Sequence, residues 1–114
     1  MRKVAICIAG IGLASCGIKP SDVLSRPPVF TEMTARTPND YAGCVAPKLN
    51  EIWPFIRALP IQNGQQILAD GSMSIPKTMI VVEVVQDGSA TKVTMHSMSG
   101  SATDASAIAA RSCL

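Results

Sequence analysis

The stretch "KTMIVVEVVQDGSATKVTMHSM", residues 77–98, decides the fold of this chain. Two runs rich in β-branched residues flank the dipeptide Asp87-Gly88, a pairing that favours a two-residue hairpin turn of type I′. With that turn, Glu83 faces Lys92 and Val82 faces Val93, so opposite charges pair on one face and apolar residues pair on the other. The stretch therefore predicts an antiparallel β-hairpin.

The two faces of this hairpin differ in character. The face expected to point at the core carries Ile80, Val82, Val84, Val93 and Met95. The opposite face carries Val81, Val85, Thr94 and His96, and it is apolar along one strand. Trp53 and Phe55 are two of the few aromatic residues, and side chains of this kind serve either as core packing or as partner contacts. We therefore predict a partner surface made of Trp53, Phe55, Val81, Val85 and His96.

A third strand is expected before the hairpin. The segment "IQNGQQILADGSMSIP", residues 61–76, contains the turn dipeptides Asn63-Gly64 and Asp70-Gly71. A short strand over residues 65–68 fits between these turns. The prediction is a three-stranded antiparallel sheet.

The segment "TPNDYAGCVAPKLNEIWP", residues 37–54, predicts a helix. Thr37 suits the N-cap, Pro38 the first helical position, and Asp40 the positive end of the helix dipole. Pro47 removes a backbone hydrogen bond, so we expect a kink there or two short helical segments. The spacing places one apolar stripe on Tyr41, Cys44, Val45, Leu49 and Ile52.

The chain ends in "ASAIAARSCL", which predicts a short helix capped by Thr103 or Asp104. One of its faces is expected to hold Ala105, Ile108, Ala109 and Cys113. Both helices would cover one face of the sheet. The expected architecture is a small single α+β domain over residues 38–114, which suffices for one modest core.

The N-terminus "MRKVAICIAGIGLASC" has a basic tip, a short apolar stretch and a small-residue exit. This layout predicts a cleaved secretory signal over residues 1–15, because the apolar stretch is about half the roughly 20 residues that a membrane span needs. Leu13-Ala14-Ser15-Cys16 resembles the lipobox of bacterial lipoproteins. The alternative is an ordinary signal peptide with a cysteine near its end.

The lipobox resemblance implies cleavage before Cys16, a diacylglyceryl group on its sulfur and acylation of its freed amine. Gly17 stands where inner-membrane lipoproteins carry an aspartate, so the resemblance implies a lipid-anchored protein of the outer membrane that faces the periplasm. The acylated Cys16 would make the lipid bilayer a partner of the chain.

Two cysteines remain in the mature chain, because Cys7 leaves with the signal and Cys16 takes lipid. In an oxidising compartment, Cys44 and Cys113 are expected to form a disulfide. Such a bridge closes a loop of roughly 70 residues and contributes roughly 4 kcal/mol. A metal site lacks ligands, since His96 is the only histidine.

Residues 17–37, "GIKPSDVLSRPPVFTEMTART", contain three prolines and no apolar period. Residues 16–37 are therefore expected to form the lipidated cysteine and a flexible tether, which could hold the body up to roughly 60 Å from the bilayer. An alternative is that one of the apolar pairs Val23-Leu24 and Val29-Phe30 docks on the body.

Charge excludes nucleic acid as a partner. The chain has 10 Lys and Arg against 8 Asp and Glu, and Arg2 and Lys3 leave with the signal, so the mature chain is neutral. A nucleic-acid binder needs a concentrated basic face.

No motif carries catalysis. His96 has no acid or nucleophile placed beside it, the serines lie in no nucleophile motif, and single turn glycines make no phosphate loop. We expect no enzyme activity, no cofactor and no metal; the methionines late in the chain are typical of core filler.

Two functions follow. The first is a non-enzymatic interaction module of the bacterial envelope, with an envelope protein as partner: an assembly or secretion component, or a blocker of the superinfection-exclusion type. The second is a small-ligand-binding or enzyme-inhibiting periplasmic lipoprotein, which requires an apolar pocket between helix and sheet.

Overall fold

The computed structural model describes residues 17–72 and 77–114. The predicted signal peptide and Cys16 lie outside the described residues. The described elements, in chain order, are α2 (Pro20–Leu24), β1 (Phe30–Thr34), α3 (Pro38–Asn50), β2 (Phe55–Ile61), β3 (Gly64–Asp70), β4 (Thr78–Asp87), β5 (Ala90–Ser97) and α4 (Ala105–Ser112).

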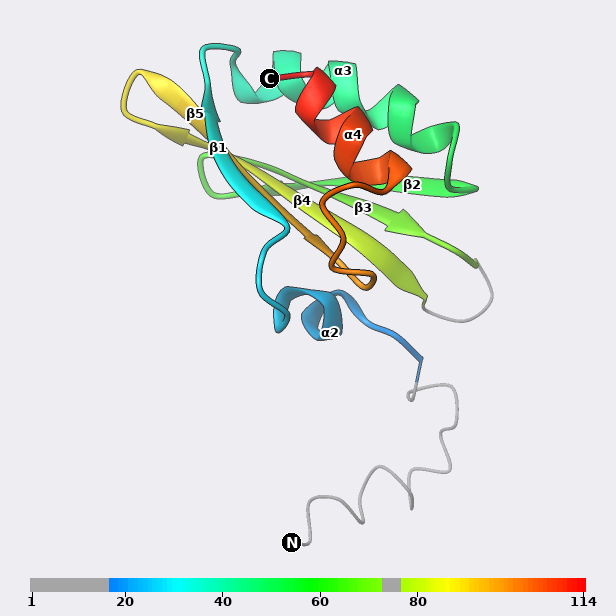
Figure 1. Cartoon of the computed structure of the whole chain (residues 1–114). Helices are drawn as coiled ribbons and strands as arrows, with labels where there is room; N and C mark the ends of the chain where they lie inside the picture. The colour runs from blue at the N-terminus through cyan, green and yellow to red at the C-terminus, as the bar shows by residue number, and fades with distance from the viewer. Residues whose placement is uncertain (1–16, 73–76) are drawn as a thin grey trace, which may run out of the picture.

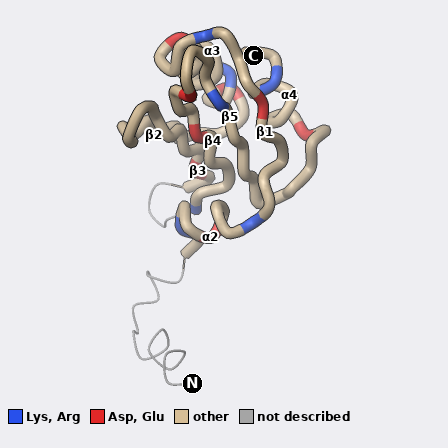
Figure 2. The backbone as a smooth tube through the Cα atoms, turned by 90° about the vertical axis from the view of Figure 1, so that its left-hand side faces the viewer, with Lys and Arg blue, Asp and Glu red and all other residues tan. Residues whose placement is uncertain are grey.

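One antiparallel sheet with the strand order β1-β5-β4-β3-β2 organises the molecule. The helices α3 and α4 cover one of its faces, and the short helix α2 lies on the other (Figure 1). The chain crosses from one edge strand to the other through α3 and returns by the meander β2-β3-β4-β5. In the view turned by 90°, α2 lies at the end of the molecule where the described chain begins (Figure 2).

The prediction of a three-stranded sheet is wrong, because the sheet has five strands. The two missed strands, β1 and β2, are the edges. Residues on an edge strand are paired on one side only and are less buried, so neither strand shows the apolar alternation that marks an interior strand. The α+β class agrees with the structure.

Strand β2 contains Pro60, which has no amide N–H to donate to a sheet. A proline within a strand is tolerated at an edge, and β2 is an edge. All of its residues are exposed or half-buried. The residues after Pro54, for which the sequence predicts no strand, therefore form an edge strand that pairs along its whole length with β3.

The flexible tether expected over residues 16–37 is wrong for the described part of that range. Residues 20–24 form α2, and residues 30–34 form β1, which pairs with β5 from Phe30↔Met95 to Thr34↔Thr91. Val23 and Phe30 are both buried. The alternative that these apolar pairs dock on the body is the one the structure shows, because burying them removes more apolar surface from water than a free tether would.

The central hairpin forms with the predicted faces but in a shifted register. Asp87 pairs with Ala90, so the two turn residues are Gly88 and Ser89 rather than Asp87 and Gly88. Gly88 has a φ of +69°, and no positive φ occurs at Asp87, which fits a type II′ turn with glycine in its first position. Each residue of β5 therefore pairs with the β4 residue two positions later than predicted. Every side chain stays on its predicted face, because strands alternate with a period of two.

The shift changes the cross-strand partners. Val84 faces Val93, and Glu83 faces Thr94 instead of Lys92. The predicted core face is confirmed, since its five members are all buried: Ile80, Val82, Val84, Val93 and Met95.

The helix α3 begins where the sequence predicts. The Thr37 side chain accepts a hydrogen bond from the backbone N–H of Asp40 (3.1 Å), and Pro38 is the first helical residue. Pro47 does not divide α3 into two segments; a bend at Pro47 stays a prediction. The stripe holds for Tyr41, Val45 and Leu49, which are buried, with Cys44 half-buried beside the core, but Ile52 lies beyond the helix end and is exposed.

The helix α4 is capped by Asp104, whose side chain accepts from the N–H of Ala107 (2.9 Å). Its predicted buried face is wrong, because Ile108 is 59% exposed, whereas Ser106, Ala107 and Ala110 are buried. Residues three or four apart lie on the same face of a helix. Cys113 is four residues after Ala109, on the predicted face, and three after Ala110, on the face that is buried, so its spacing fits both faces.

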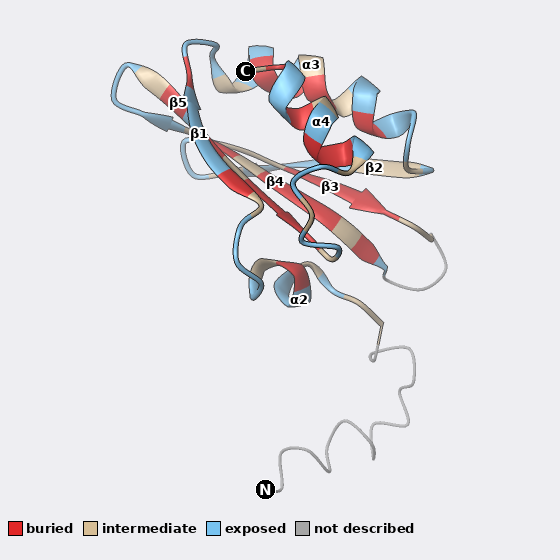
Figure 3. Ribbon diagram, in the orientation of Figure 1, coloured by how far each residue is buried: buried red, intermediate tan, exposed pale blue. Residues whose placement is uncertain are grey.

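The main core lies between the sheet and the helices α3 and α4, and the ribbon segments coloured as buried concentrate there (Figure 3). Tyr41 is its largest polar member, and its hydroxyl donates to the carbonyl of Ala110 (2.6 Å). A second, smaller cluster of Val23, Leu68 and Val81 lies on the opposite face of the sheet, under α2.

Candidate functional site

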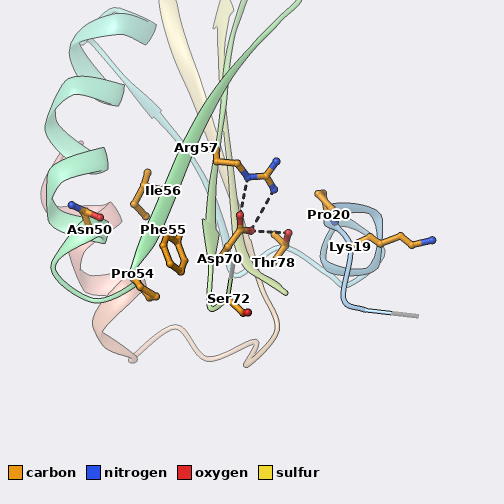
Figure 4. Close-up of a pocket in the computed structure, with 10 residues that line it drawn as sticks. All are labelled: Lys19, Pro20, Asn50, Pro54, Phe55, Ile56, Arg57, Asp70, Ser72 and Thr78. Carbon is orange, nitrogen blue, oxygen red and sulfur yellow. Dashed lines mark hydrogen bonds and ion pairs between the residues drawn. The ribbon is translucent and has the colours of Figure 1, made fainter. Parts of the chain in front are cut away.

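A cleft of about 890 Å³ opens between the start of α2 and the start of β2 (Figure 4). Its walls come from α2, the end of α3, the loop before β2, and the adjoining ends of β3 and β4. The residues that line it are Lys19, Pro20, Asn50, Pro54, Phe55, Ile56, Arg57, Asp70, Ser72 and Thr78.

An ion pair forms the polar wall of the cleft. The Nε of Arg57 donates to Oδ2 of Asp70 (2.7 Å), and Thr78 Oγ1 donates to Oδ1 of the same carboxylate (2.9 Å). The side chain of Asp70 is 12% exposed and that of Arg57 is 48% exposed. The buried carboxylate therefore fixes a guanidinium whose outer part remains open to solvent.

The sheet register brings these three residues together from separate strands. Arg57 and Phe55 point to the same face of β2, and Asp70 is the direct partner of Phe55 on β3. Between Ala69 and Asp70 the pairing of β3 with β4 shifts by one residue, which places Thr78 opposite Asp70.

Phe55, Pro54 and Ile56 supply the apolar wall. The chain that enters β2 is held by Trp53, whose Nε1–H donates to Oγ of Ser106 (2.9 Å). This bond ties the start of β2 to the first turn of α4. The apolar wall is thus fixed by the helix layer, while Pro20 contributes from α2.

The polar wall of the cleft is held together by its own hydrogen bonds. Both carboxylate oxygens of Asp70 accept hydrogen bonds, so this group is a structural anion and not a free base. Among residues 17–72 and 77–114, no three His, Cys, Asp or Glu side chains are placed to hold a metal ion. An exposed guanidinium edge beside an aromatic ring fits a ligand with an anionic group and an apolar body.

The structure separates the residues predicted to form a partner surface. Val81 is buried under α2, and His96 is largely buried, with its Nδ1 donating to the carbonyl of Arg26 (2.8 Å). Trp53 packs against the main core, and Phe55 faces the cleft. The prediction of one surface is therefore wrong, because α2 covers the middle of that sheet face. Beyond α2, Val85 is half-buried.

Cys44 and Cys113 are joined in a disulfide across 69 residues of sequence. The bridge links α3 to the last turn of the chain, on the side of the sheet away from α2. It lies outside the cleft.

Sequence reasoning missed the polar wall of the cleft. Arg57 lies on an unpredicted edge strand and Lys19 in the supposed tether, so nothing placed them near Asp70. The available signal was Asp70 itself, a carboxylate directly after the apolar run Ile67-Leu68-Ala69, where burial requires a partner.

Comparison with known proteins gives no match: no family model, curated protein or solved structure matches the chain. Over the described residues, none of the helices has the length and apolar character needed to cross a bilayer.

Proposed function

We propose that the chain is a lipid-anchored lipoprotein of the bacterial envelope, and that it acts as a non-enzymatic binding module at the membrane surface. The proposal rests on the resemblance of Leu13-Ala14-Ser15-Cys16 to a lipobox, and the point at which the described chain joins the body is compatible with it. Ile18, two residues after Cys16, already pairs with Lys77, and its carbonyl accepts from the N–H of Thr78 (3.0 Å).

Because Ile18 is already paired with the body, no long tether separates Cys16 from the folded domain. Two residues span at most about 7 Å, so a lipid on Cys16 holds the folded body directly at the bilayer. Three acyl chains on one terminus make such an anchor effectively permanent, since each buried methylene contributes about 0.8 kcal/mol.

A protein partner would meet the helix layer, which lies on the opposite side of the sheet from α2 (Figure 1). A shallow groove between α3 and α4 exposes Ile52 (39% exposed) and Ile108 (59% exposed), and Lys48 and Glu51 border it. Two exposed isoleucines with a charged border offer apolar contact area to a protein partner.

Metabolic labelling with a palmitate analogue tests the anchor. We expect the native chain to be labelled and Cys16→Ser to lose the label, while Cys7→Ser, the matched control within the signal, keeps it. Labelling that persists in Cys16→Ser contradicts the lipoprotein assignment.

A pull-down from detergent-solubilised envelope tests the binding module. We expect a stoichiometric protein that is retained by the native chain and by Leu59→Ser, a control at an exposed apolar residue of β2, and that is lost with Ile108→Ser. Equal retention by both variants places the partner elsewhere on the body.

The cleft favours a second candidate function, the binding of a small amphiphilic ligand. It lies between helix and sheet, combines Phe55 with the open edge of Arg57, and has the volume of a small-molecule site. An empty pull-down, together with thermal stabilisation by an anionic amphiphile that Arg57→Gln abolishes, would favour this function over a protein partner.

A further inference from the structure

The charges of the mature chain are unevenly distributed, although they sum to zero. Lys19, Arg26 and Lys77 flank α2, where Asp22 is the one acidic residue. Leaving aside the Arg57–Asp70 pair, the rest of the mature chain carries four basic and six acidic residues. The α2 end therefore has a net charge of +2 and the remainder −2.

The backbone holds the three cations around α2. Lys19 is the N-cap of α2, and its N–H donates to Oδ2 of Asp22 (2.8 Å). Arg26 follows the C-cap, and its carbonyl accepts from His96. Lys77 is bridged to Ile18, next to Lys19. Basic segments accordingly lie on either side of α2 in the charge-coloured view (Figure 2).

These three side chains are exposed, and none of them forms an ion pair with another described residue. In the described part of the chain, the ion pairs are Arg57–Asp70 and Arg111–Glu32, and neither involves Lys19, Arg26 or Lys77. In Figure 4 the side chain of Lys19 extends away from the Arg57–Asp70 pair. The ammonium and guanidinium groups around α2 are therefore available to an external anion.

We propose that Lys19, Arg26 and Lys77 form a bilayer-facing surface that binds the headgroups of anionic glycerophospholipids and orients the body with α2 against the membrane. This proposal rests on the lipid anchor of the proposed function. We refer to these three residues as the α2 basic collar.

The course of the chain argues for a bilayer as the occupant. Cys16 lies at most about 7 Å of chain from Ile18, which is within one Debye length of a charged surface at physiological salt. Lys19 and Lys77, beside Ile18, are thus inside the field of the leaflet that holds the anchor, and Arg26 joins them when α2 lies along the membrane. Two net positive charges near an anionic surface favour the docked orientation by about 30-fold.

The test uses the full chain, purified in its acylated form and reconstituted into vesicles of phosphatidylcholine alone or with about a quarter of phosphatidylglycerol. Hydrogen exchange of residues 21–25 is then followed by mass spectrometry. We expect these amides to exchange several-fold more slowly in the anionic vesicles, and we expect high salt to remove the difference.

Charge reversal identifies the residues responsible. The variant Lys19→Glu/Arg26→Glu/Lys77→Glu should exchange equally in both vesicles. The control Arg36→Glu/Lys48→Glu/Lys92→Glu has the same net charge, alters exposed residues away from α2, and should retain the difference. If the collar variant fails to fold, the comparison of vesicles and salt on the native chain decides alone.

Different results would contradict the basic collar and the lipid anchor on which it rests. Equal exchange of native α2 in both vesicles overturns the collar even when intact mass shows lipid on Cys16. Slower exchange that appears only after envelope proteins are added overturns it too, because the occupant is then an acidic protein. A chain without lipid that washes off neutral vesicles contradicts the anchor instead.

Discussion

Tyr41 joins α3 to α4, and its buried hydroxyl donates to the carbonyl of Ala110 (2.6 Å). Burial raises the pKa of Tyr41 well above its usual value, because the phenolate would lose its hydration inside the core. The folded state therefore requires the neutral phenol. Removing the hydroxyl should lower the free energy of unfolding by about 1–2 kcal/mol near neutral pH, since the Ala110 carbonyl loses this donor.

The raised pKa gives this residue a pH signature. In the unfolded chain Tyr41 ionises near pH 10, whereas in the folded protein it stays neutral beyond that pH, so its stabilising effect is complete below about pH 10 and declines above it. Urea unfolding of the native chain and Tyr41→Phe should show a stability gap that narrows above about pH 10. A gap that is constant across this range would contradict the assignment.

Arg57 and Glu32 provide a second comparison between single residues. Arg57→Gln leaves the mostly buried Asp70 carboxylate with Thr78 and should lower the free energy of unfolding by about 1–2 kcal/mol, less than a fully buried pair because Arg57 is half exposed. Glu32→Gln breaks only the exposed pair with Arg111 and should cost less than about 0.5 kcal/mol. Urea denaturation measures both values, and equal costs would show that the cleft pair is not buried in solution.

At the scale of elements, substitutions of two glycines by alanine test two different effects: close strand packing at Gly64 and helix propensity at Gly43. A Cβ on Gly64 would lie 1.8 Å from the Val84 carbonyl oxygen on the neighbouring strand, whereas a Cβ on Gly43 in α3 meets nothing within 4 Å. Gly64→Ala should therefore lower the free energy of unfolding by about 3 kcal/mol or prevent folding. Gly43→Ala should raise it by about 0.5–1 kcal/mol.

Thermal unfolding of the two alanine variants checks this contrast. A tolerated Gly64→Ala would mean that β3 and β4 do not approach each other as described. A destabilising Gly43→Ala would mean that the exposed face of α3 is covered in solution.

The elements that the sequence predicts well are those with a local signal. The N-cap of α3 follows from Thr37 and Pro38, and the hairpin faces follow from a period-two pattern that a register shift of two cannot disturb. The turn itself was misplaced by one residue, because Gly88 can occupy the first position of a type II′ turn as readily as the second position of type I′.

The missed elements lack such a signal. In β1, the exposed Glu32 shares a face with the buried Phe30 and Thr34, which hides the alternation. The helix α2 is five residues long, too short for a helical period, and β2 carries Pro60. The cleft depends on α2 and β2 together, so the sequence does not predict its arrangement, although it marks Phe55 as a candidate contact residue and Asp70 as a carboxylate that needs a partner.

At the scale of the whole molecule, the Cys44–Cys113 disulfide ties α3 to the C-terminus across 69 residues. A loop of this length should contribute about 4 kcal/mol in the chain-entropy model. Cys44→Ser and Cys113→Ser should each lower the free energy of unfolding by a similar amount, and the double variant should cost little more than either. Alkylation of both thiols in the native, unreduced protein would contradict the bridge.

The proposed lipid anchor is the claim on which the membrane-facing role of Ile18, α2 and the basic collar depends, because that role requires a membrane at Cys16. The intact mass of the protein recovered from the envelope tests this claim most directly. The predicted result is a chain that begins at Cys16, without residues 1–15, and that carries the added mass of its acyl groups. A chain with an unmodified Cys16 would contradict it.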